Sequence, residues 1–180
     1  MAHEARFRNA QLRYFIGEFN WAVNALDILK GSTSKLIAND AMSLSILISD
    51  NQNIDTAALS LFAKADYASY RRQDKEAKIF LDEIINKHSN ATSTPYALIR
   101  LAKIAQRDKD FNAVDSLCTV IYSDFPESFV ADQALMLDAK ILAEELKNKE
   151  KALKCYEKIL DEYNVSLYLA EARKNYRLLK

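Results

Sequence analysis

The sequence has very few of the residues that interrupt helices or close tight turns. Its 180 residues include only 2 glycines and 2 prolines. An all-β domain needs many tight turns, which glycine and proline commonly form, so their scarcity argues against that class. Alanine, leucine, lysine, glutamate, aspartate and isoleucine dominate instead, and most of these favour helices. The composition therefore predicts an all-α protein.

The chain also lacks an excess charge and a long apolar run. Its 25 basic and 25 acidic residues are interspersed and give a formal net charge of +0, so there is no positive field to attract nucleic acid. No segment reaches the roughly 18 consecutive apolar residues of a membrane-spanning helix. We expect neither a nucleic-acid partner nor a membrane span. No leader is visible at Met1, and the abrupt start suggests a domain excised from a longer protein.

Residues that carry chemistry are scarce as well. His3-Glu4 begins like a zinc-protease motif, but no second histidine follows at the required spacing, and His88 lies far away. A zinc site needs three or four ligands. The sequence contains no glycine-rich phosphate loop, nucleophile motif or paired acid signature. We therefore expect a non-enzymatic protein with no catalytic residue, metal ion or cofactor.

The two cysteines, Cys118 and Cys155, lie on or beside apolar helix faces. Axes of packed helices are about 8–10 Å apart, whereas a disulfide needs Cα atoms within about 7 Å. We expect two buried thiols in preference to a disulfide.

The best-formed helical pair runs from Leu98 to Pro126. Its first apolar face follows the i, i+3, i+4, i+7 spacing of a helix, at Leu98, Leu101, Ala102 and Ala105. A polar break, 106–110, separates it from a second apolar face at Phe111, Val114, Cys118 and Ile121. Pro126 cannot continue a helix and ends the pattern.

Similar pairs recur along the chain, and the predicted units span 4–30, 57–88, 95–125 and 129–163. Their second helices share a small or β-branched position at Ala22, Ala77, Val114 and Ala152. Gly17 marks the first turn, the second turn at 72–74 has no glycine, and the fourth at 146–149 carries one extra residue. Expected core positions of the first helix include Ala10, Phe15 and Ile16.

Two further helices lie outside this pattern. An extra helix is predicted over 35–51, after a possible cap at Ser32–Ser34, in a region without Lys, Arg or Glu between Lys35 and Lys64. Such an uncharged helix is usually buried or covered. A last helix over 166–180 offers Leu167, Leu169 and Ala172 for packing and a polar outer face that suits the end of a repeat array.

Two short helices with a polar break and a terminal proline resemble one tetratricopeptide (TPR) unit. The shared positions are 55, 37 and 38 residues apart; the first interval includes the extra helix, and the other two are close to the period of about 34 residues in that family. The resemblance implies a single domain, a right-handed α-α superhelix of about ten helices. Phe125-Pro126-Glu127-Ser128 and the segment from Tyr163 to Arg173 resemble elements of two periplasmic TPR groups. These are the outer-membrane assembly lipoprotein and the Tol-Pal-associated protein. That narrower resemblance favours a bacterial periplasm or cell envelope over the cytoplasm.

In the resembled fold, the first helix of each unit lines a concave groove that holds a partner peptide. Carrying that register over implies groove positions at Tyr14, Asp66, Tyr70, Tyr96, Ile99, Lys103, Gln106, Met136 and Lys140. Phe7 and Phe62 share the register, but packing is the favoured role for them. For Tyr70, Tyr96 and Lys103, groove contact and packing both remain open.

The resemblance thus implies a protein-interaction scaffold that binds a protein or peptide segment on its concave face. An alternative is a structural module in which helix 35–51 covers the groove or forms an oligomer interface. The oligomeric state stays open.

Overall fold

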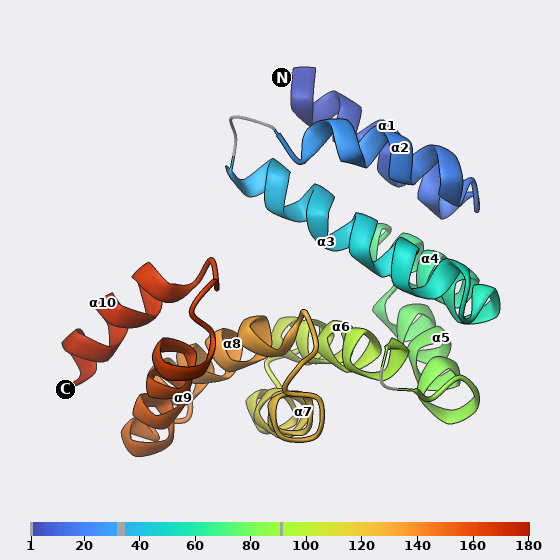
Figure 1. Cartoon of the computed structure of the whole chain (residues 1–180). Helices are drawn as coiled ribbons and strands as arrows, with labels where there is room; N and C mark the ends of the chain where they lie inside the picture. Colours follow the sequence, from blue (N-terminus) through green and yellow to red (C-terminus); the bar gives the residue numbers. More distant parts are fainter. Residues whose placement is uncertain (1, 32–34, 91) are drawn as a thin grey trace. The chain divides into compact units, whose positions relative to one another are not determined.

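The structure is a computed structural model, and it describes residues 2–31, 35–90 and 92–180, with side chains for all of these except 35 and 36. Within these ranges the chain forms ten α-helices and no strand (Figure 1). In chain order they are α1 (Ala2–Phe15), α2 (Phe19–Leu29), α3 (Lys35–Gln52), α4 (Thr56–Tyr70), α5 (Asp74–Lys87), α6 (Ser93–Arg107), α7 (Phe111–Asp124), α8 (Ala131–Glu144), α9 (Lys149–Glu162) and α10 (Leu169–Leu179). The predicted all-α class is confirmed.

The sequence also predicts a helix cap after α2 and no membrane-spanning helix. The predicted cap at Ser32–Ser34 lies outside the described residues. Within the described ranges, no helix is both long enough and apolar enough to cross a bilayer.

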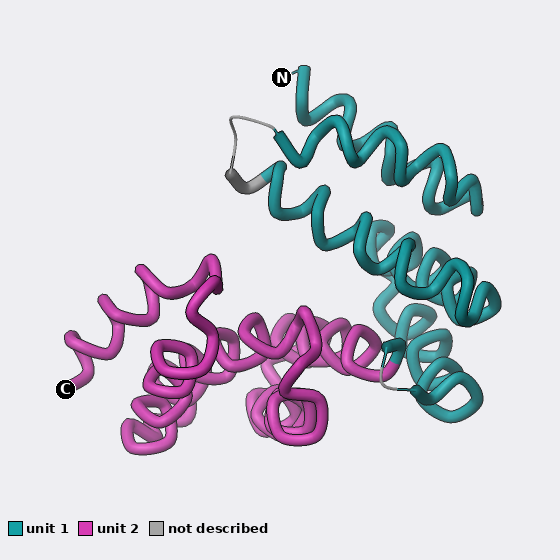
Figure 2. The backbone as a smooth tube through the Cα atoms, viewed as in Figure 1, with its two compact units in different colours: residues 1–93 teal, residues 94–180 magenta. Residues whose placement is uncertain are grey.

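The chain divides into two compact units, residues 1–93 and 94–180 (Figure 2). In the first unit, α1 packs against α2, α2 against α3, α3 against α4 and α4 against α5, while α1 also contacts α3 and α4. In the second unit, α7 packs against α8, α8 against α9 and α9 against α10.

Three of the helical pairs reverse direction through the same backbone geometry. Glu18, Gln73 and Asp110 each donate their backbone N–H to the last turn of the preceding helix, at Arg13, Ala68 and Ala105 (2.9 Å in each case). The residue before each donor makes the second, shorter-range bond of the same motif, as in Gly17 to Tyr14 (3.0 Å). These are the paired bonds of a Schellman motif, which ends a helix with one left-handed residue.

Only one of these left-handed positions is a glycine. Gly17 has a φ of 85°, whereas Arg72, Lys109 and Lys147 have φ values of 62°, 60° and 55°. A side chain makes this conformation unfavourable, so the last three turns are strained relative to the first. In the fourth turn, Asn148 donates to Leu142 (2.8 Å), which lies one residue further back than in the other pairs. The predicted extra residue is therefore confirmed.

The middle of each pair is occupied by small residues. The second helices bury Ala22, Ala77, Val114 and Ala152, and the first helices bury their counterparts Ala10, Ala65, Ala102 and Ala139, all at 0–1% exposure. Small side chains allow the axes of two helices to approach closely. In a core packed this densely, a change in side-chain volume of even one methylene alters stability. The four pairs thus share their small buried positions, and the first three also share one turn geometry.

Helix α3 uses much of its apolar surface within the first unit. Its buried residues are Ala41, Ser45, Leu47, Ile48 and Asn51. The Ser45 hydroxyl donates to Asp27 of α2 (3.2 Å), and the Asn51 amide donates to the carbonyl of Leu47 (2.8 Å). Met42 remains 39% exposed. The predicted extra helix exists, and it packs on α2 and α4.

Two core assignments from the sequence are wrong. Ile16 follows the end of α1 and is 68% exposed, because the chain has already begun to turn at Gly17. Leu167 precedes α10 and is 67% exposed. Helical spacing extended past a helix end no longer describes which side chains face the core.

The strained turns give a first prediction. We expect Arg72→Gly to raise the free energy of unfolding by roughly 0.5–1 kcal/mol, because glycine adopts a positive φ without a steric penalty. Glycine at Asp82, an exposed position within α5, is the matched control and should lower it by about 1 kcal/mol. Urea denaturation measures both, and destabilisation by both substitutions would contradict the left-handed turn.

Candidate functional site

The predicted groove residues of the first unit meet where α1 lies beside α4. The Tyr14 hydroxyl donates to Oδ2 of Asp66 (3.0 Å) and so links the two helices. Tyr14 is only 1% exposed, so in this structure it is a core residue and not a groove contact. The Tyr14 ring also lies beside the rings of Phe15 and Phe19, whose centroids are 5.7 and 6.0 Å away.

An exposed aromatic cluster adjoins this link. The Phe15 ring lies 5.4 Å from Tyr67 and 5.9 Å from Tyr70, in tilted arrangements that are favourable for aromatic pairs. Tyr67 is 41% exposed and Tyr70 is 59% exposed. We call Phe15, Tyr67 and Tyr70 the aromatic face. It brings together one predicted groove residue, Tyr70, with two residues that the groove prediction did not include.

Arginine side chains lie against aromatic rings in the same unit. The Arg71 guanidinium is 4.5 Å from the Tyr67 ring centroid and pairs with Glu76 (3.4 Å). The Arg13 guanidinium is 4.9 Å from the Trp21 ring and pairs with Glu18 (2.6 Å). Such stacking restricts the motion of the Tyr67 ring and of the Arg71 guanidinium.

The predicted groove residues of the second unit divide into two groups. Tyr96, Ile99 and Met136 are buried, at 4%, 2% and 2% exposure. They are core residues here, because apolar side chains on a helix that is covered on more than one side pack inward. The groove assignment of these three, like that of Tyr14, is not compatible with their burial.

The polar members of that set lie at the surface. Lys103 of α6 donates to Gln133 of α8 (3.3 Å), Lys140 of α8 pairs with Glu171 (2.7 Å), and Gln106 is exposed. Lys103 and Lys140 thus join neighbouring helices.

The second unit also contains a polar cluster that the sequence analysis did not predict. Asp138 of α8 is fully buried, and its Oδ2 accepts a hydrogen bond from the Tyr122 hydroxyl of α7 (2.9 Å). The Cys155 thiol of α9 lies 3.8 Å from the same oxygen. Lys151 of α9 forms a short ion pair with Asp115 of α7. We call these five residues the buried polar cluster, although Asp115 and Lys151 at its edge are half-buried.

Thr119 closes the cluster on the α7 side. Its hydroxyl lies 2.9 Å from the Tyr122 hydroxyl and 3.5 Å from Oδ1 of Asp115, and Lys151 donates to it at 3.3 Å. Hydrogen bonds in a buried network of this kind reinforce one another. The cluster therefore couples three consecutive helices, α7, α8 and α9.

Burial raises the pKa values of the carboxyl, thiol and phenol groups of Asp138, Cys155 and Tyr122. It raises the pKa of Asp138 to about 7, with a further contribution from the charge of Asp115. It raises the pKa of Cys155 to about 12 and also raises the pKa values of Cys118 and Tyr122. Burial opposes the charged form of Lys151, but its hydrogen bond with Asp115 and the nearby carboxylates raise its pKa overall.

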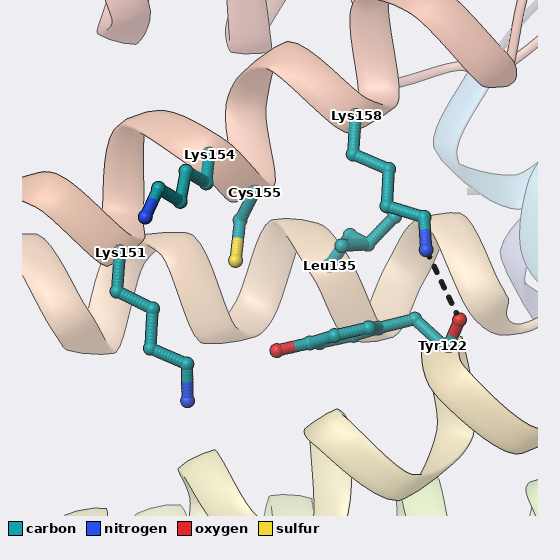
Figure 3. Close-up of a pocket in the computed structure, with 6 residues that line it drawn as sticks. All are labelled: Tyr122, Leu135, Lys151, Lys154, Cys155 and Lys158. Atoms are coloured by element: carbon teal, nitrogen blue, oxygen red, sulfur yellow. Dashed lines mark hydrogen bonds between the residues drawn. The ribbon is translucent and has the colours of Figure 1, made fainter.

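A pocket of about 210 Å³ opens beside the cluster (Figure 3). It is lined by Tyr122 and Leu135 and, from α9, by Lys151, Lys154, Cys155 and Lys158. Each ammonium group already faces a carboxylate: Lys151 faces Asp115, Lys154 faces Glu150 (2.8 Å) and Lys158 faces Glu162 (3.8 Å). Because these charges are balanced, the pocket does not form an anion site.

The histidine and cysteine positions give no metal site. Among the described residues, no group of three or more His, Cys, Asp or Glu side chains is placed to hold a metal ion. Nδ1 of His88 lies 2.7 Å from Asp55, whose other oxygen caps α4 at the Ala58 N–H (2.9 Å). Both bonds lower the pKa of Asp55, the Ala58 bond most strongly. Cys118 and Cys155 are buried free thiols, as predicted.

Of the unpredicted site residues, Asp138 is the one with a weak signal in the sequence. Asp138 lies in the apolar register of Leu135, Ala139 and Leu142, and an acidic residue in such a register indicates either a break in the face or a buried polar group. Tyr67 stands next to the predicted Asp66, but its proximity to Phe15 depends on how α1 packs on α4.

Comparison with known proteins adds no family. No model of a known protein family matches the chain, and no curated protein matches it significantly.

The hydrogen bond from Tyr122 to Asp138 gives a second prediction. We expect Tyr122→Phe to lower the free energy of unfolding by about 1–3 kcal/mol, because it leaves a buried carboxyl oxygen without its main donor. Tyr163→Phe is the control: its hydroxyl donates to the Pro126 carbonyl at an exposed site (3.0 Å), so the loss should stay under about 1 kcal/mol. Equal losses in urea denaturation would contradict the role of the buried bond.

The raised thiol pKa values give a third prediction. Thiolate is the reactive form of cysteine, and both thiols are buried. We expect Cys118 and Cys155 in the native protein to react with iodoacetamide at neutral pH at least about a hundredfold more slowly than in guanidinium chloride. Mass spectrometry of the alkylated peptides measures the two rates, and fast native labelling of either cysteine would contradict its burial.

Proposed function

We propose that this protein is a helical-repeat module of the tetratricopeptide type that binds a segment of a partner protein and catalyses no reaction. The observation that carries the proposal is the aromatic face, Phe15, Tyr67 and Tyr70. These residues lie on α1 and α4, the first helices of the first and second helical pairs. Interface residues that contribute most to affinity are enriched in tyrosine, tryptophan and arginine. The repeated turn geometry supports the repeat assignment, since equivalent units present equivalent helix faces.

The aromatic face suits a partner segment with an apolar anchor side chain. Tyr67 and Tyr70 expose 41% and 59% of their surface, and Leu12, 55% exposed, adds apolar surface on α1. The rings are already ordered by mutual contact and by Arg71, so binding costs little side-chain entropy. The local charges are paired within the unit, which favours recognition of an apolar anchor over recognition of a charge pattern.

A bacterial cell-envelope setting is part of the proposal. It is supported by the resemblance of Phe125–Ser128 and of Tyr163–Arg173 to periplasmic tetratricopeptide proteins. The two segments also meet in this chain, since the Tyr163 hydroxyl donates to the Pro126 carbonyl (3.0 Å).

The structural alternative has less support. It requires α3 to present an apolar surface to a second molecule or to a groove. Much of that surface is already used by α2 and α4, and Met42 is the large apolar side chain that α3 exposes among its described residues. We therefore favour the interaction function.

A fourth prediction tests the aromatic face. Peptides selected by phage display against the purified protein should carry an aliphatic or aromatic anchor. Tyr70→Ala and Tyr67→Ala should each weaken their binding at least about tenfold, which corresponds to about 1.4 kcal/mol. Fluorescence anisotropy of the selected peptides measures the affinities.

Phe129→Ala is the matched control for this experiment. Phe129 is 42% exposed, close to the value for Tyr67, but lies outside the aromatic face. Its removal should change peptide affinity by less than about twofold. Equal binding by all variants would show that the aromatic face does not contact the peptide, and light scattering would report any dimer that complicates the comparison.

A further inference from the structure

Asp138 is the one acidic or basic side chain that is fully buried among the described residues. Its Oδ2 has two donors, the Tyr122 hydroxyl and the Cys155 thiol. Its Oδ1 is also buried and accepts no hydrogen bond. A buried carboxylate oxygen without a donor is costly, and the cost disappears if that oxygen carries a proton.

The carboxylate of Asp115 is the acceptor for the hydrogen bond that protonated Asp138 donates. Its carboxyl group acts on Asp138 both through its charge and through a side-chain hydrogen bond, and both effects favour the protonated form of Asp138. Asp115 itself is held by Lys151 and lies within 3.5 Å of the Thr119 hydroxyl. With one proton on Asp138, the set contains one carboxylate and one ammonium and is neutral. Without that proton, two carboxylates share a single cation.

We propose that the Asp138–Asp115 carboxyl pair is a proton-operated latch that holds α8 against α7 and α9. With the proton bound, Asp138 donates to α7 through Asp115 and accepts from α7 through Tyr122. Loss of the proton replaces the first of these bonds with a repulsion between two carboxylates. The latch lies in the second unit and does not depend on the proposed peptide-binding function.

The surrounding charged and titratable groups leave Asp138 as the group that changes near neutral pH. On α7 these groups are Asp115, Cys118 and Tyr122, and on α9 they are Lys151 and Cys155; Lys103 of α6 acts on Cys118. Burial raises the pKa values of both thiols and of the phenol, which therefore stay neutral. The raised pKa of Lys151 keeps it positively charged.

The direction of the pH effect follows from proton linkage. Burial raises the pKa of Asp138 from 3.8 to about 7, so between these values the folded protein holds a proton that the unfolded chain releases. Stability from this group is therefore fully present below about pH 4 and falls as the pH rises to about 7, above which it is absent. Between pH 6 and pH 8 the unfolding equilibrium constant should rise about tenfold.

Asp138→Asn tests the latch directly. Asparagine has nearly the same shape, can donate to Asp115 through its amide and accept from Tyr122 through its oxygen, but cannot ionise. Urea denaturation at pH 6 and pH 8 should give the tenfold change for the natural protein and no change attributable to this site for the variant. All other titrating groups are common to both proteins, so the difference between their pH responses isolates Asp138. Identical pH responses would overturn the proposal.

Two measurements on the natural protein keep the proposal testable if the variant folds poorly. The side-chain carboxyl ¹³C shift of Asp138 should titrate with a midpoint near 7, and a midpoint below 5 would overturn the proposal. Amide exchange in α8, corrected for intrinsic base catalysis, should be about tenfold faster at pH 8 than at pH 6. A carboxyl that titrates near 7 without faster exchange in α8 would show that the proton does not control a latch.

Discussion

The fold of this protein depends on one backbone constraint: each helical pair must reverse direction within a few residues. In three pairs a Schellman motif achieves this by placing Gly17, Arg72 or Lys109 at positive φ. The fourth turn is one residue longer and places Lys147 at positive φ. The unfavourable conformation of Arg72, Lys109 and Lys147 persists because the paired helices bury enough surface to offset it. A turn this short also fixes the register in which the two helices meet.

That fixed register explains why small residues are buried at equivalent places. Ala10 and Ala22 occupy the first pair, and Ala65 and Ala77 occupy the second, all at 0–1% exposure. When helices approach this closely, the large side chains on either side of the contact are drawn into the core. Tyr14 is an example, since it is buried while its hydroxyl reaches Asp66. Tyr67 and Tyr70 of the aromatic face, at the end of α4, remain exposed.

The buried polar cluster lies in a similarly close helix contact, but its side chains are polar. An apolar side chain of the same volume in place of the buried Asp138 would be expected to give comparable or greater stability. What the network adds is a requirement for particular partners, because Oδ2 of Asp138 needs the Tyr122 hydroxyl and a proton on Oδ1 needs Asp115 as its acceptor. The cost of a buried acid becomes a sensitivity to protons, since the cost depends on whether the acid is ionised.

Much of the fold could be predicted from the sequence, because helix spacing and turns are local properties. The ten helices, the extra residue near Asn148 and the buried thiols of Cys118 and Cys155 all follow from patterns within a few turns. Little of the candidate site could be predicted in this way. The contacts of Phe15 with Tyr67 and of Asp138 with Tyr122 join separate helices. The periodicity of one helix does not indicate which side chains of a neighbouring helix pack against it. The sequence by itself determined which segments are helical and how they pair; only the tertiary structure decided which tyrosines are exposed and which carboxyl is enclosed, because burial depends on what packs against each face.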